Sequence, residues 1–238
     1  MRKEINWINL HNQVKHKFNL INSKLWWGDD LDVRFYVLYK LLKLKHKKIL
    51  DIGCNIGVSL SFLDRSNQIY GIDINKDLIT QAKKYSPNFH LIEANMNKLP
   101  FENNSFDVII MMNVIPYYDF KIDIESKNKF INEVFDEVNR VLRINGSIYL
   151  STPNGNSPHY KNRKIKIKEL KNILNNYSYT IKIRGWNNVF SGRLSFLSKF
   201  FIPKIFYRFN LTWNYLIKNM NSKVETSKYF YIEAKKKY

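Results

Sequence analysis

Two glycines four residues apart, Gly53 and Gly57, follow an apolar run that carries Asp51 near its end, in the segment ILDIGCNIG. A strand that continues through a glycine turn into a helix aims backbone N–H groups at a ligand beyond the strand end. A side chain at Gly53 would enter the space where the turn approaches that ligand. Asn55 lies between the glycines and belongs to the few non-glycine residue types that tolerate positive φ. We therefore expect the turn to keep its shape.

The spacing of this turn separates several nucleotide-binding families. A dinucleotide-binding turn requires G-x-G-x-x-G, of which only the first glycine is present, and no G-K-[ST] follows for a phosphate-binding loop. NAD and FAD are therefore disfavoured. The turn instead resembles the first signature of class I S-adenosylmethionine-dependent methyltransferases, D-x-G-x-G-x-G, and especially the type 11 group found in quinone and lipid biosynthesis. Asp51, Gly53 and Gly57 match this signature, and Asn55 takes its middle position.

Two later segments are similar to further signatures of the same family. YGIDINKDLI contains Asp73, 20 residues after Gly53, where the resemblance implies an acid that accepts hydrogen bonds from both ribose hydroxyls. The alternative for Asp73 is a helix N-cap or a solvated loop acid. EANMNKLPF places Asn95 where the family has an Asp that contacts the adenine amino group, and Met96 where a backbone N–H faces the ring. The amide oxygen of Asn95 can still accept that hydrogen bond.

The remaining signatures follow in the family's order. MMNVIPYYD resembles the segment that borders the methyl group, with Asn113 and Val114 near the methionine moiety and Tyr117 where many relatives carry His. FINEVFDEVNRVLRINGSIYL is similar to the pattern E-x-x-R-V-L-K-P-G-G. The resemblance covers about residues 47 to 154 and implies S-adenosyl-L-methionine as the cofactor. The implied cofactor-binding residues are Asp51, Gly53, Cys54, Asn55, Gly57, Asp73, Ile74, Asn95, Met96 and Asn113.

Two residues are candidates for a catalytic base. Methyl transfer from a sulfonium is an in-line displacement in which positioning supplies much of the catalysis, so a base is needed only if the acceptor must first lose a proton. Tyr117 and His159 are the candidates; the alternatives are that Tyr117 lines the pocket and that His159 lies in a solvated loop. Asn113 and Pro116 superficially resemble the N-P-P-Y motif of enzymes that methylate amide or exocyclic nitrogens, but two residues separate them. No Cys/His cluster has metal-ligand spacing, so no metal is expected.

Short apolar runs alternate with amphipathic stretches, a pattern typical of a parallel sheet covered by helices on both faces. We expect strands at 47–53, 68–73, 89–94, 106–112, 147–152, 179–186 and 228–236, and helices at 32–44, 58–65, 76–85 and 125–142. Together with the resemblance, this pattern predicts an α/β fold: a Rossmann-like, doubly wound, mostly parallel seven-stranded sheet with a helical lid insertion. We expect an N-terminal helical acceptor-side segment at 1–46 and the methyltransferase domain at 47–238, with an aromatic, basic insertion at about 189–220.

The formal net charge of +19 is unevenly distributed. Residues 1–48 carry 11 basic and 4 acidic side chains, residues 49–155 carry 10 and 13, and residues 156–238 carry 18 and 3. Basic flanks suit nucleic acid or an anionic membrane, but a composition rich in Lys, Asn and Ile also follows from coding bias. The single Cys and the lack of a signal peptide or an 18-residue apolar run indicate a cytoplasmic protein. Peripheral membrane contact stays open.

Three functions remain open at this point. The first is an S-adenosylmethionine-dependent methyltransferase that acts on a small-molecule or lipid-like acceptor, met by the N-terminal segment and the insertion. The second is an RNA methyltransferase whose basic flanks neutralise phosphates, with a steep salt dependence. The third is a non-catalytic binding protein that keeps the cofactor fold as a scaffold, which the intact Asp51, Gly53, Gly57 and Asp73 disfavour.

Overall fold

The computed structural model describes residues 37, 40–57, 59–115, 124–156, 165–186, 224–227 and 229–238. Tyr117, His159, the insertion at 189–220 and most of the segment 1–46 therefore lie outside the described residues. Among the described helices, none is long and apolar enough to cross a membrane.

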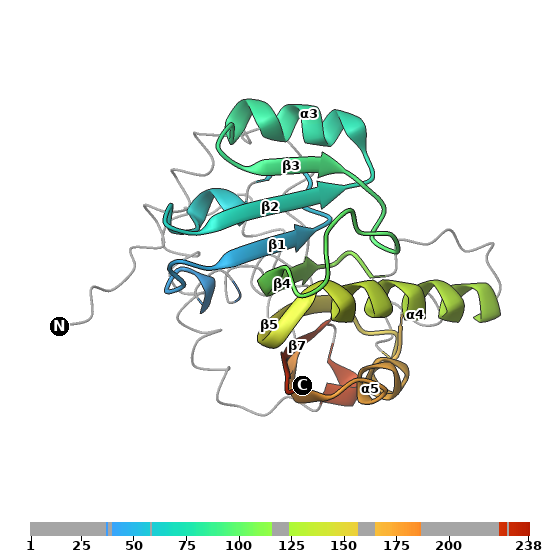
Figure 1. Ribbon diagram of the computed structural model, residues 1–238. Coiled ribbons are helices and arrows are strands. Elements are labelled where there is room, and N and C mark those ends of the chain that lie inside the picture. The colour runs from blue at the N-terminus through green and yellow to red at the C-terminus, as the bar shows by residue number, and fades with distance from the viewer. Residues whose placement is uncertain are drawn as a thin grey trace, which may run out of the picture.

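Seven strands form one sheet in the order β3-β2-β1-β4-β5-β7-β6 (Figure 1). The strands are β1 Lys48–Ile52, β2 Gln68–Asp73, β3 His90–Glu93, β4 Phe106–Met112, β5 Leu142–Pro153, β6 Tyr179–Trp186 and β7 Tyr229–Lys236. Neighbouring strands from β3 to β5 pair in parallel, whereas β7 is antiparallel to both β5 and β6. The expected doubly wound, mostly parallel sheet of seven strands is confirmed.

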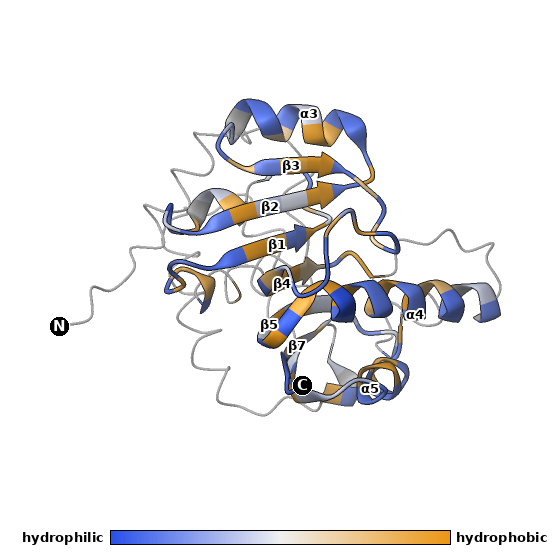
Figure 2. Ribbon diagram, in the orientation of Figure 1, coloured by the Kyte–Doolittle hydropathy of each residue, from blue (hydrophilic) through white to orange (hydrophobic). Residues whose placement is uncertain are grey.

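The helices cover the two faces of this sheet. They are α3 Lys76–Tyr85, α4 Ile124–Val141 and α5 Ile167–Asn175, with 3-10 helices η2 Ser59–Phe62 and η4 Val224–Thr226. Along β4, Val108, Ile110 and Met112 pack in a cluster with side chains of α3, while Ile109 and Met111 pack in a second cluster with side chains of α4 and α5. Since central parallel strands are buried on both faces, they read as nearly continuous apolar runs (Figure 2).

Some local expectations differ from the structure. The helix expected at 58–65 is, in the described residues, only the 3-10 helix η2. The chain then turns at Asp64, which accepts hydrogen bonds from Ser66 N through Oδ1 and from Asn67 N through its carbonyl. The buried Asn67 donates its amide to the carbonyls of Leu44 and Asp64. Such side chain to backbone bonds offer an alternative to helical hydrogen bonds and end the helix early.

Helix α5 was not expected from the sequence. Its buried residues Ile167, Leu170 and Leu174 follow helical spacing, and Glu169 accepts a hydrogen bond from Lys166 N in a capping arrangement. The lysines between these apolar residues conceal the pattern, although the apolar spacing and Glu169 together could have predicted a short helix.

We predict that Gly71→Ala destabilises the fold because strand β2 has no room for a methyl group there. A Cβ at Gly71 would lie 2.8 Å from both Cys54 Sγ and Leu91 Cδ2. Overpacking of this kind costs about 1–3 kcal/mol of unfolding free energy, measurable by urea denaturation. Cys54→Ala removes Sγ and leaves the Cβ of residue 54 at 3.0 Å, so the double variant should lose less stability than the sum of the single variants. Simple additivity would contradict this packing account.

Candidate functional site

The candidate site lies where the order of strands reverses. From β1 the chain proceeds outward to β2 and β3, and then returns to place β4 on the other side of β1. In Figure 1 these four strands point the same way, so their carboxyl ends meet at one edge of the sheet. Open α/β sheets bind ligands in the crevice beyond such a switch point.

The glycine turn after β1 is built from residues in the left-handed region. Gly53, Asn55 and Gly57 have φ values of +73°, +53° and +75°. The N–H groups of Gly53 and Cys54 both donate to the carbonyl of Ile72, at 2.8 and 2.9 Å. Asn55 Oδ1 accepts a hydrogen bond from Ile56 N at 2.7 Å. The expectation that Asn55 preserves the turn by adopting positive φ is confirmed.

Asp73 joins this turn to the start of α3. Its Oδ2 accepts a hydrogen bond from Asn55 N and its Oδ1 accepts one from Asn75 N, both at 3.0 Å. Asn75 is the N-cap of α3, with its side chain accepting from the backbone of Asp77 and Leu78. The N-cap role considered for Asp73 is therefore wrong. A carboxylate has about four acceptor sites, so each Asp73 oxygen keeps the capacity for a further hydrogen bond.

Asp51 and Cys54 lie beneath the turn rather than on its surface. Asp51 is buried at the end of β1, and Cys54 is a buried free cysteine whose Sγ packs over Gly71. Burial raises the pKa of the Cys54 thiol, and the negative charges of Asp51 and Asp73 raise it further. Because the thiolate is the reactive form, Cys54 is not a nucleophile at neutral pH.

The ends of β2 and β3 complete the same edge. Ala94 N donates to the carbonyl of Asp73 at 3.1 Å, which holds the start of the loop after β3 next to β2. In that loop Asn95 is exposed and Met96 packs half-buried against the larger core cluster. Ile74 is 70% exposed beside Asp73, so it presents an apolar surface at this edge.

The end of β4 meets the glycine turn from the other side. Asn113 has φ +57°, and its N–H donates to the carbonyl of Ser151 at 2.8 Å. The next residue, Val114, lies so close to the turn that a Cβ at Gly53 would come within 2.1 Å of Val114 Cγ1. The sequence suggested that a ligand keeps Gly53 small, whereas the structure shows a protein side chain at that position.

The structure thus brings the ten expected cofactor-binding residues to one edge of the sheet, at the carboxyl ends of β1 and β2 and on the turns after β1, β2, β3 and β4. The two candidate bases, Tyr117 and His159, lie outside the described residues. Sequence reasoning missed Asn75, although an Asn followed two residues later by Asp at the start of an amphipathic helix is an N-cap signal. In the described part of the chain, no three His, Cys, Asp or Glu side chains gather in a way that could hold a metal ion.

Residues 50–150 match a family model described as "Methyltransferase domain". This region is therefore similar to methyltransferase domains. A crystal structure of a SAM dependent methyltransferase from Archaeoglobus fulgidus shares its fold, with a TM-score of 0.57 and 18% identity over 95% of this chain and 99% of that chain.

Two curated relatives resemble this chain more closely in sequence. A malonyl-[acyl-carrier protein] O-methyltransferase of Legionella pneumophila is 29% identical over 129 residues, which are 52% of this chain and 42% of the relative. A ubiquinone/menaquinone biosynthesis C-methyltransferase of Campylobacter jejuni is 29% identical over 120 residues, 46% of this chain and 51% of the relative. The chain thus spans about half the length of these relatives.

We predict that Gly53→Val destabilises the turn strongly, whereas Asn55→Gly changes its stability little. Gly53→Val combines a positive φ with the contact at Val114, so it should cost about 2–5 kcal/mol of unfolding free energy. Asn55→Gly loses one local hydrogen bond but relieves a left-handed residue, so its effect should stay within about 1 kcal/mol. Thermal and urea unfolding would measure both. A tolerated valine together with a damaging glycine would refute the turn geometry.

Proposed function

We propose that the protein transfers a methyl group from S-adenosylmethionine to a small-molecule or lipid-like acceptor. The observation that carries this proposal is the link from Asp73 to Asn55 N and Asn75 N at the switch point of the sheet. These bonds hold a carboxylate beside a glycine turn, and a carboxylate there can accept hydrogen bonds from the two ribose hydroxyls of a nucleoside. The match of residues 50–150 to the methyltransferase domain model supports the same conclusion.

Each strand end has a proposed role in binding the cofactor. Asp73 accepts hydrogen bonds from the ribose hydroxyls, and the exposed side chain of Ile74 covers one face of the adenine ring. Asn95 accepts a hydrogen bond from the adenine amino group, and the backbone N–H of Met96 donates to the ring. The Gly53–Gly57 turn and Asn113 border the methionine moiety, with Asp51 supporting the turn from below.

The proposed reaction is a displacement at the sulfonium methyl carbon. A lone pair on the acceptor forms the new bond to carbon, the carbon–sulfur bond breaks, and its electron pair stays on sulfur to give S-adenosylhomocysteine. If the acceptor carries a proton, that proton leaves to water or to a base, for which Tyr117 and His159 are the proposed residues. Alignment of acceptor and methyl group supplies much of the rate enhancement, since oriented reactants gain about 7–11 kcal/mol.

Two considerations favour a lipid-like acceptor. The relatives described above are named for O-methylation of malonyl-[acyl-carrier protein] and for C-methylation in ubiquinone and menaquinone biosynthesis. The sequence at 189–220 is rich in Phe, Tyr, Trp and Leu with Lys or Arg every few residues, a composition that suits an acceptor lid or an anionic interface.

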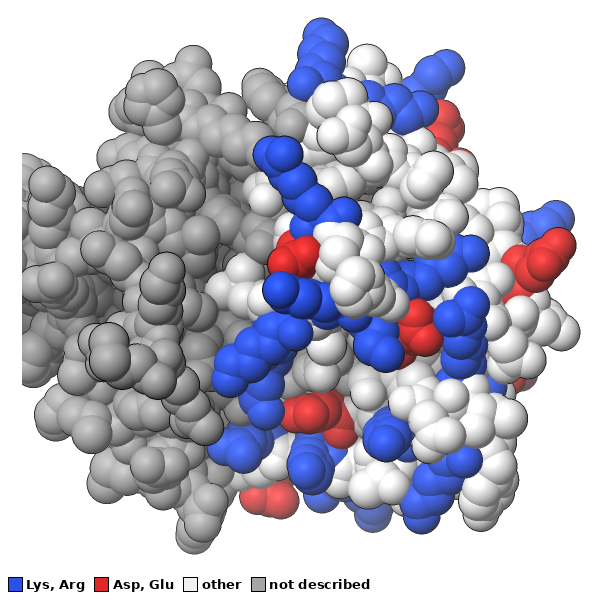
Figure 3. Space-filling view, turned by 60° about the vertical axis from the view of Figure 1, so that its left-hand side comes forward, with Lys and Arg blue, Asp and Glu red and all other residues white. Residues whose placement is uncertain are grey.

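The surface charge of the described part gives less support to an RNA substrate. On the face in Figure 3, Lys and Arg cover more of the surface than Asp and Glu, although acidic side chains lie between the basic ones. Among the described residues, Lys45 pairs with Asp64 at 3.9 Å and Arg143 pairs with Asp107 at 3.1 Å. A mixed surface attracts polyanions less than a surface of a single sign.

We predict that the wild-type protein binds S-adenosylhomocysteine and that Asp73→Asn weakens this binding by about 1–3 kcal/mol, because hydrogen bonds to an ionised group are worth about that much. Isothermal titration calorimetry would measure both affinities. Asp77→Asn is the matched control, since it removes an exposed carboxylate four residues along the chain in α3. Failure of the wild-type protein to bind would overturn the proposed function, and equal affinities of Asp73→Asn and wild type would remove Asp73 from the site.

We predict that the protein binds anionic vesicles more strongly than neutral ones if the acceptor lies in a membrane. Each Lys or Arg near such a surface contributes about 1 kcal/mol, an attraction that salt weakens. Replacing Phe200 and Phe201 with Ser should reduce binding even at low salt, since burial of each ring is worth about 1.5–3 kcal/mol. Co-sedimentation would measure this. Retention on RNA instead, lost when Lys161, Arg163, Lys164 and Lys166 are neutralised, would favour an RNA acceptor.

A further inference from the structure

One face of α4 is polar and lies against the loop between β3 and β4. Glu133, Glu137 and Arg140 are spaced at i, i+4 and i+7, so they share one side of the helix. The opposite side is apolar and carries Val134, Phe135 and Val138 into the core. The polar side therefore has a different task from the packing of α4 on the sheet.

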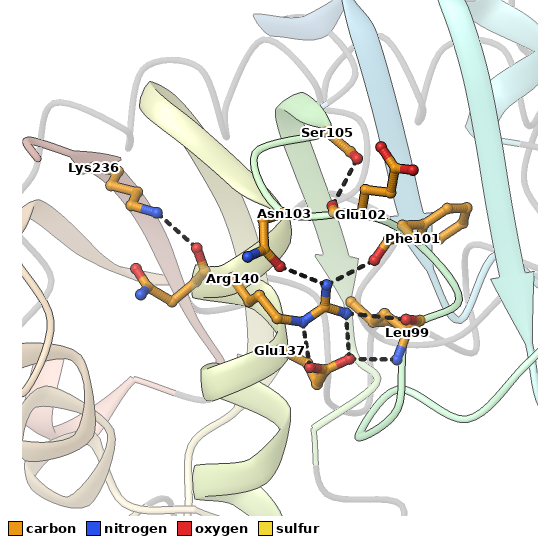
Figure 4. A network of polar contacts seen from close by, with 9 residues as sticks. Leu99, Phe101, Glu102, Asn103, Ser105, Glu137, Arg140 and Lys236 are labelled. Carbon is orange, nitrogen blue, oxygen red and sulfur yellow. Dashed lines mark hydrogen bonds and ion pairs between the residues drawn. The ribbon is translucent and has the colours of Figure 1, made fainter.

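The polar side of α4 forms hydrogen bonds with this loop at successive points along its length. Glu133 Oε2 accepts a hydrogen bond from Asn97 Nδ2 at 2.9 Å, and Glu137 Oε2 accepts one from Leu99 N at 2.6 Å. The Arg140 guanidinium donates to the carbonyls of Leu99 and Phe101, at 3.1 and 2.7 Å. It also donates to Asn103 Oδ1 at 3.0 Å (Figure 4).

Glu137 and Arg140 also form an ion pair with each other. Arg140 Nε lies 2.6 Å from Glu137 Oε1 and Nη2 lies 2.8 Å from Oε2, so the pair is bidentate. The side chain of Glu137 is 19% exposed and that of Arg140 is 31% exposed. The hydrogen bond from Arg140 lowers the pKa of Glu137, which keeps the carboxylate ionised at neutral pH. Paired and partly shielded from water, the two groups have a fixed geometry.

The loop that they hold begins at the candidate cofactor edge. Ala94 N is bound to the carbonyl of Asp73, Asn95 and Met96 follow, and the first contact with α4 comes at Asn97. The side chain of Leu99, midway between the hydrogen-bonded residues Asn97 and Phe101, is buried in the core. The position of residues 95 and 96 is therefore set from both sides, by β2 before them and by α4 after them.

We propose that Glu137 and Arg140 are positioning residues for recognition of the cofactor's base, acting through the backbone of the loop at residues 97–101 on Asn95 and Met96. This inference rests on the proposed function, since it assumes that S-adenosylmethionine occupies the carboxyl edge of the sheet. Neither side chain touches the cofactor. Their effect on binding is transmitted by the loop.

The test measures base recognition separately from stability. Calorimetry gives the affinities for S-adenosylhomocysteine and for S-inosylhomocysteine, in which a carbonyl replaces the adenine amino group. Arg140→Met, which removes the hydrogen bonds that the Arg140 side chain donates to Leu99, Phe101 and Asn103, should weaken S-adenosylhomocysteine binding about tenfold and reduce the preference for adenine over hypoxanthine. Arg140→Lys keeps the positive charge but loses the planar, bidentate guanidinium, so it should show a smaller loss of affinity and of base preference. It provides the test if Arg140→Met does not fold.

Two control variants remove hydrogen bonds of α4 that do not involve the loop. Tyr177→Phe removes the bond from Tyr177 Oη to Asp136 Oδ1, and Lys236→Met removes the bonds from Lys236 Nζ to the carbonyls of Asn139 and Leu142. Both should lower the melting temperature while keeping the affinity for S-adenosylhomocysteine within about twofold and the base preference unchanged.

The outcomes distinguish an error in the proposed function from an error in the positioning role alone. If the wild-type protein binds neither ligand, the proposed function is wrong and the positioning role falls with it. If the wild-type protein binds S-adenosylhomocysteine but the Arg140 variants keep its affinity and base preference, the positioning role alone is overturned. The same holds if affinity falls in the controls as much as in the Arg140 variants at equal loss of melting temperature, because the pair would then act only on stability.

Discussion

The carboxylate of Asp73 is the interaction on which the arrangement of the site depends. One of its oxygens holds the backbone of the glycine turn after β1, and the other holds the backbone that leads into α3. Two N–H groups that would otherwise need water or ligand as partners are thereby satisfied, and an unmade bond of this kind costs about 1–3 kcal/mol when buried. The same acid can therefore shape the site and remain available to a ligand, because its acceptor capacity exceeds the two bonds it makes.

Sequence reasoning predicted the sheet well because its central strands are determined locally. Runs such as FDVIIMM are buried on both faces and are bounded by turn residues, so their position hardly depends on distant contacts. The positive φ of Asn55 followed from residue type alone. In contrast, α5 has only nine residues, and the lysines between its apolar positions conceal the spacing that could have predicted it.

The features of the site that the sequence did not reveal are contacts between distant residues. Leu99 and Glu137 are 38 residues apart, and nothing in either neighbourhood specifies the other. The contact of Gly53 with Val114 likewise depends on how β1 and β4 pair, although both residues stood in segments that the sequence had singled out. Residue types thus identified the members of the site, whereas the pairing of strands determined which of them touch.

The placement of β7 bears on the order in which the domain assembles. This strand follows β6 in the sequence but lies between β5 and β6 in the sheet, where it pairs with both. Its Lys236 also binds the carbonyls at the end of α4, the helix that holds the loop after β3. During synthesis, β6 leaves the ribosome before it has a neighbour in the sheet, so it must wait for β7 while the strands from β1 to β5 can already pair. Until β7 is made, β5 and β6 each lack the neighbour that β7 provides in the sheet, and unpaired strand edges of this kind favour mispairing.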